Sequence, residues 1–140
     1  MKDWILSIAN SVNRKEKRVQ SLKDLTEVIL TTLKKAINED IENLNNEIYG
    51  GEAVLEVSDL DEKSFTITHV ETKEITLVSF SPREELLDCA IGGTGKRVFI
   101  SIKTDDKGEI NYIESSGSRL SPDRLSQQLL EPLIKSAHKL

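Results

Sequence analysis

The spacing of the hydrophobic residues changes once along this 140-residue chain, and that change constrains the fold more than any other feature. Between residues 22 and 48 apolar side chains recur at Leu22, Leu25, Ile29, Leu33, Ile37, Ile41, Leu44 and Ile48. These seven steps cover 26 residues, or about 3.7 residues per step, close to the 3.6 of a straight α-helix. After Gly50-Gly51, which favours a helix end, the period becomes two. The pattern predicts a long helix followed by a β-sheet.

The period of two predicts up to six strands, at Ala53–Val57, Ser64–Val70, Glu74–Phe80, Glu85–Ile91, Arg97–Ile102 and Glu109–Glu114. Turns such as Asp59–Glu62 and Asp105–Gly108 separate them. Because the connections are short, we expect an antiparallel meander. The fourth segment has an alternative, since Ser81-Pro82-Arg83-Glu84 also matches a helix start and would make Pro82–Cys89 a short helix.

Helices are also expected at both ends of the chain. Trp4, Ile8 and Val12 form one stripe of a short amphipathic helix, Lys2–Val12. The basic tract Arg14–Arg18 that follows is interpreted as a solvated connection, so that the long helix starts at Ser21 or, alternatively, near Arg14. At the other end Ser121 caps a helix that places Leu125, Leu129 and Leu133 on one face. Pro132 is expected to bend or break that helix.

These elements predict an α+β fold, a two-layer α/β sandwich in a single domain covering residues 1–140. Its parts are the helices of residues 1–49, a sheet of about five to six strands in residues 52–116, and the C-terminal helix of residues 121–138. The only cysteine, Cys89, excludes a disulfide within the chain. No signal-peptide pattern and no apolar run of about 20 residues is present, so a cytoplasmic protein without an integral membrane segment is expected.

The net charge of -5 is concentrated in the middle of the chain. Residues 51–120 carry eight basic and fourteen acidic side chains, whereas residues 1–50 carry eight of each. Because nucleic-acid affinity depends on Lys and Arg neutralising phosphates, this distribution predicts that nucleic acid is not a partner. The Arg14–Arg18 tract could give a peripheral membrane contact, which we consider less favoured than a solvated role.

The loop Gly92–Lys96 has the composition of a phosphate-binding loop but not its pattern. Ala90 stands where the first glycine belongs, Arg97 stands where a Ser or Thr would hold magnesium, and a strand follows in place of a helix. We therefore expect a hairpin loop that does not bind nucleotide.

Three further groups of residues are of types that could take part in catalysis. Asp59, Glu71 and Lys73 have the composition of a metal-dependent nuclease site, but such a triple is common by chance in a chain with 31% charged residues. His69 and His138 lack a ligand at zinc-site spacing, so His69 is expected to be a satisfied, partly buried residue. Cys89 is expected to behave as a small hydrophobic residue. No cofactor, metal or catalytic residue is predicted.

The sequence thus favours a non-enzymatic protein-interaction module of the adaptor, chaperone-like or immunity type. Small size, acidity and helix–sheet–helix order are also bulk features of type III secretion chaperones, an analogy that involves no shared motif. The predicted partner is a protein, most simply a second copy in a homodimer. The expected interaction residues are Leu22, Leu25, Ile29, Leu33, Ile37 and Ile41. The alternatives are a small-ligand-binding domain with a pocket between helices and sheet and, less favoured, the nuclease.

Overall fold

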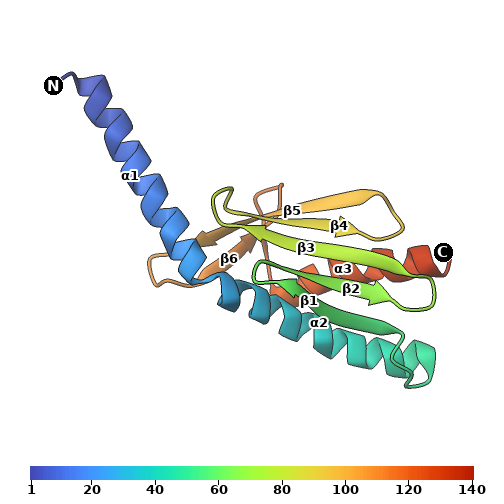
Figure 1. Cartoon of the computed structure of the whole chain (residues 1–140). Coiled ribbons are helices and arrows are strands. Elements are labelled where there is room, and N and C mark those ends of the chain that lie inside the picture. Colours follow the sequence, from blue (N-terminus) through green and yellow to red (C-terminus); the bar gives the residue numbers. More distant parts are fainter.

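The computed structural model describes residues 1–140 and has the predicted α+β architecture: two N-terminal helices, an antiparallel meander and a C-terminal helix (Figure 1). The helices are α1 (Asp3–Asp24), α2 (Thr26–Tyr49) and α3 (Pro122–Ala137). The strands are β1 (Leu55–Asp61), β2 (Ser64–His69), β3 (Glu74–Ser81), β4 (Leu86–Ile91), β5 (Lys96–Thr104), β6 (Ile110–Ile113) and β7 (Arg119–Leu120).

All seven strands form one sheet in chain order, and every neighbouring pair is antiparallel. This exceeds the expected five to six strands by β7, a two-residue strand that pairs with β6 just before α3. Two residues are too few to produce an alternating pattern in the sequence. The fourth segment is a strand and not a helix, since β4 pairs with β3 and β5 along its length.

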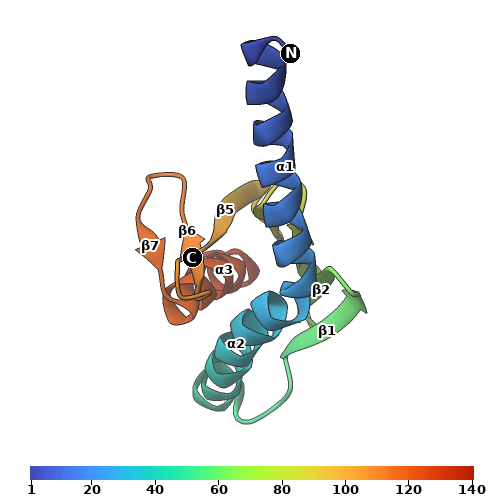
Figure 2. The same ribbon diagram turned by 90° about the vertical axis from the view of Figure 1, so that its left-hand side faces the viewer.

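Helices α2 and α3 lie side by side and pack on one face of the sheet (Figure 2). Between the layers is a core of 21 buried residues, which holds Phe65 and Ile67 of β2, Val78 and Phe80 of β3, and Leu87 of β4. Alternate strand residues, such as Ile75 and Phe99, are exposed. One face of the sheet is therefore buried and the other is open to solvent, a common state for an antiparallel sheet.

The break between the two N-terminal helices is at Leu25, not between Val12 and Ser21 as expected. Helix α1 runs through the basic tract because Arg, Lys and Glu are good helix formers and no Gly or Pro interrupts them. At Leu25 the backbone leaves helical geometry (φ -97°, ψ 0°) and the chain changes direction. Helix α1 therefore points away from the rest of the molecule (Figure 1).

Two further elements extend beyond the positions where the sequence predicted an interruption. Strand β1 extends through Asp59 to Asp61, although this segment was expected to turn, because only Asp61 closes the turn by accepting hydrogen bonds from Lys63 N (2.8 Å) and Ser64 Oγ (2.7 Å). Helix α3, which was expected to bend or break at Pro132, is not broken there and continues to Ala137. Leu130 and Leu133 flank that proline and are buried, so packing against the rest of the core outweighs the missing backbone hydrogen bond.

A tyrosine hydroxyl links the sheet to α2 at the first turn of that helix. Tyr112 of β6 is buried, and its Oη donates to the carbonyl of Ile29 over 2.8 Å. We predict that Tyr112→Phe lowers the free energy of unfolding by about 0.5–1.5 kcal/mol, measured by urea denaturation at neutral pH. An unchanged urea midpoint would contradict this prediction.

The same residue predicts a pH effect. Burial raises the pKa of Tyr112 to about 12 in the folded protein, against about 10 in an unfolded chain. Between these values the unfolded state binds fewer protons than the folded state, so this contribution to stability is lost as the pH rises from about 10 to 12. The stability of the wild type should fall more steeply over this range than that of Tyr112→Phe.

Candidate functional site

The N-terminal half of α1 carries an apolar stripe that nothing in the chain covers. Trp4, Ile8 and Val12 are 61%, 55% and 50% exposed, and Ile5 beside them is also exposed. Further along α1 the same side of the helix is buried at Val19 and Leu22. The face that packs on the body at the base of α1 therefore continues outward as an uncovered surface. We call residues 3–13 of α1 the arm.

Ion pairs at the base of α1 hold the arm in its direction. Lys15 and Arg18 contact the Glu85 carboxylate at 3.2 Å and 2.9 Å, and Arg83 contacts Glu16 at 2.9 Å. Glu85 and Arg83 lie in the β3–β4 turn. Burial raises the pKa of Glu85, but hydrogen bonds from Arg18 and Lys15 outweigh that effect and hold it below its ordinary value. The basic tract was expected to be a solvated connection between helices. It instead attaches α1 to the sheet.

The structure places the predicted interaction residues Leu22, Ile29, Leu33, Ile37 and Ile41 inside the core, while Leu25 is half-buried at the helix junction. The sheet and α3 cover nearly the whole stripe of α2, and only Ile48 at its end is largely exposed. The sequence predicted both apolar stripes, the short one near the N-terminus and the long one of α2. Hydrophobic periodicity does not show which of the two is buried within the folded chain. The arm, in contrast, has an apolar stripe that the chain leaves uncovered.

A second uncovered apolar surface is the groove between the C-terminal half of α2 and α3. It has a volume of about 570 Å³, and its apolar lining consists of Leu44, Ile48, Leu130, Ile134 and Leu140. Three carboxylates, from Asp40, Asp123 and Glu131, and one lysine, Lys135, also line it. We call this surface the α2/α3 groove. Nothing in the sequence analysis identified it, because its lining comes from helices about 80 residues apart.

The two histidines of the chain both contact one tyrosine, Tyr49, which follows the groove residue Ile48 at the end of α2. Tyr49 Oη lies 3.0 Å from His69 Nε2 and 2.8 Å from His138 Nε2. The Thr72 backbone N–H donates to His69 Nδ1 over 3.3 Å, so His69 Nε2 carries the proton and donates to Tyr49 Oη. The same Tyr49 hydroxyl hydrogen-bonds to His138 Nε2. Burial and, to a smaller extent, the charge of Glu71 raise the pKa of Tyr49. His69 is buried and fully hydrogen-bonded.

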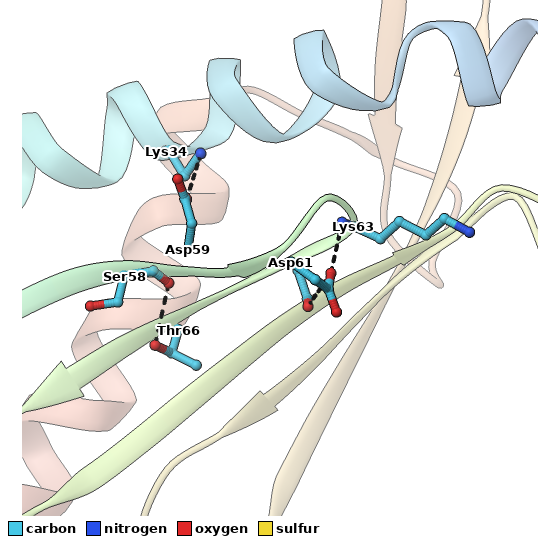
Figure 3. Close-up of polar contacts among 7 residues, drawn as sticks. Lys34, Ser58, Asp59, Asp61, Lys63 and Thr66 are labelled. Atoms are coloured by element: carbon cyan, nitrogen blue, oxygen red, sulfur yellow. Dashed lines mark hydrogen bonds and ion pairs between the residues drawn. The ribbon is translucent and has the colours of Figure 1, made fainter.

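The nuclease residues do not come together. Asp59 lies on β1, where its carboxylate pairs with Lys34 of α2 at 2.7 Å (Figure 3). Glu71 and Lys73 lie in the β2–β3 turn. This turn is next to the end of β1 at which Leu55 pairs with His69 of β2. Four residues of β1 separate Asp59 from Leu55, a distance of roughly 13 Å at the rise of a β-strand. This geometry does not support the nuclease interpretation.

The glycine-rich loop joins β4 to β5, as expected for a hairpin, and packs tightly against its neighbours. The Gly92 N–H donates to Thr76 Oγ1 (3.0 Å), and Ser136 Oγ of α3 donates to the Gly93 carbonyl (3.1 Å). A Cβ atom on Gly92 would lie 2.6 Å from the backbone N and O of Ile75. The first glycine is therefore required by backbone packing.

This packing predicts a difference between two alanine substitutions in the same loop. Gly92→Ala should lower the free energy of unfolding by about 3 kcal/mol, because the atoms that oppose the new methyl group belong to backbone that cannot move aside. Gly95→Ala is the control: its Cβ meets open space, and only its positive φ of 69° costs about 1 kcal/mol. Equal losses in urea denaturation would contradict the assignment of Gly92 to packing.

Cys89 is fully buried on β4. Burial, with a smaller effect of the Asp88 charge, raises the pKa of its thiol to about 12. Because the thiolate is the reactive form, we predict that a thiol-specific reagent at pH 8 does not modify the folded protein and modifies one thiol per chain in urea. Reaction of the folded protein at the rate of free cysteine would contradict this prediction.

No family model, curated protein or solved structure matches this chain. No helix has both the length and the continuous apolar character needed to cross a bilayer. The structure assembles no group of three or more His, Cys, Asp or Glu side chains that could hold a metal ion.

Proposed function

We propose that this protein is a non-enzymatic protein-interaction module that binds its partner through the arm. The observation that carries this proposal is the exposed stripe of Trp4, Ile8 and Val12 on a helix that projects from the body (Figure 1). Contiguous apolar surface of this kind commonly marks an interaction site. Full burial of one such side chain contributes about 1.5–3 kcal/mol, so three or four together can offset the entropic cost of association.

The way α1 is held supports the same proposal. The ion pairs to Glu85 and Arg83 fix the direction of the arm before any partner arrives. A binding element that is already ordered loses less conformational entropy on association. The hollow between α2 and β1 gives little support to the small-ligand alternative, because it is lined by polar side chains such as Lys34, Asn38 and Asp59.

The only tryptophan of the chain, Trp4, tests the proposal directly. Partner binding should move Trp4 from water to an apolar environment and shift its fluorescence to shorter wavelength. Ile8→Lys should abolish both the shift and co-purification of the partner. Leu6→Lys is the matched control, because Leu6 is 45% exposed but lies away from the stripe. Retention of every protein association by Ile8→Lys would refute the proposal.

A further inference from the structure

We propose that the arm of one copy of this chain binds in the α2/α3 groove of a second copy. This inference rests on the proposed function and names its partner. It starts from a coincidence in one molecule: the chain presents an uncovered apolar helix and, elsewhere, an uncovered apolar groove between two helices. An amphipathic helix that lies in an apolar groove with anchors at i, i+4 and i+8 is a recurrent mode of protein recognition.

The lengths of the two surfaces agree. Trp4 and Val12 are eight residues apart, which is roughly 12 Å along a helix. On the α2 side the groove extends from Asp40 to Ile48, also eight residues and roughly 12 Å. The arm can therefore place its three anchors, one turn apart, along the full length of that wall.

The arm itself carries one charged side chain, Asp3, and its charge complementarity to the groove comes from the basic residues at its base. Residues 1–18 carry five basic and two acidic side chains, a net charge of +3, whereas the other 122 residues carry fourteen basic and twenty-two acidic side chains, a net charge of -8. At the base of the arm Arg14 and Lys17 make no ion pair, and in the groove Asp40 and Asp123 make none either. Opposite charges of this kind favour encounter and set the orientation of docking.

The arm cannot enter the groove of its own chain. The two surfaces lie at similar distances from the Leu25 junction, since the arm starts twelve residues before it and the groove fifteen residues after it, so the direction of α1 is what keeps them apart. From the junction the arm points away from the body, held by the contacts of Lys15 and Arg18 with Glu85 (Figures 1 and 2). The groove that it meets therefore belongs to another copy. Two copies related by a two-fold axis exchange arms and fill both grooves, which gives a closed dimer.

Two single substitutions separate the arm from the groove. Ile8→Lys puts a charge on the arm, and Ile48→Lys puts one in the groove. Both side chains are exposed, so both variants should fold. The controls are Leu6→Lys on the other side of the arm and Val28→Lys on α2 outside the groove, where Val28 is 49% exposed against 45% for Ile48.

Sedimentation equilibrium at tens of micromolar should give the wild type and both controls a mass of twice 15.7 kDa. Each of the two test variants alone should dissociate at least about tenfold more readily. Their mixture should form a one-to-one dimer, because the Ile48→Lys chain supplies an intact arm and the Ile8→Lys chain an intact groove. On addition of the Ile8→Lys protein, Trp4 of the Ile48→Lys protein should shift to shorter wavelength.

The remaining outcomes overturn the inference in distinguishable ways. If Ile48→Lys stays dimeric while Ile8→Lys does not, the arm binds another surface and the proposed function survives. If the wild type is monomeric but Ile8→Lys loses a different protein partner, the proposal that a second copy is the partner is refuted and the proposed function survives. If vesicles of phosphatidylserine, but not the protein itself, shift Trp4, the arm is a membrane element and both proposals fail.

Discussion

The burial of one helix face against the sheet determines the rest of this structure. Ile29, Leu33 and Ile37 of α2 are completely buried, and they meet residues from β2 to β6 and from α3 in a single core. Aromatic residues are scarce, so this core is built mainly from branched aliphatic side chains, which stabilise through close packing. The sheet and α3 cover the apolar stripe of α2. Helix α1 therefore finds no apolar surface of the core to pack on, except at its last turns.

The change of direction at Leu25 makes α1 an appendage of the body. Had α1 and α2 formed one straight helix, the apolar sides of both would follow a single line. The break turns α1 toward the β3–β4 turn, where Glu85 and Arg83 provide opposite charges. Exposed ion pairs are individually weak, but three around one turn, with Val19 and Leu22 buried beside them, define one orientation.

The sequence was sufficient to predict the fold class, because hydrophobic periodicity depends only on neighbours along the chain. It placed the end of α2 at Gly50 and the start of α3 at Ser121 correctly, since both signals are local. It misplaced the helix break, because no Gly or Pro marks Leu25. It also left open a break at Pro132, which does not occur because the continuation of α3 depends on tertiary packing. The sequence predicted that the arm is helical but not that its apolar side is exposed. It did not predict the α2/α3 groove or the contacts of His69 and His138 with Tyr49. These properties depend on contacts between residues that are distant in the sequence.

The hydrogen-bond chain through Tyr49 determines how rigid the α2/α3 groove is. Tyr49 follows Ile48, a groove residue, and His138 lies just past the last turn of α3, so the chain from His69 through Tyr49 to His138 fastens the ends of both walls to the sheet. Walls fastened in this way keep their separation whether or not anything lies between them. The groove is therefore already formed in the free chain, with its two walls linked to each other and to the sheet through Tyr49.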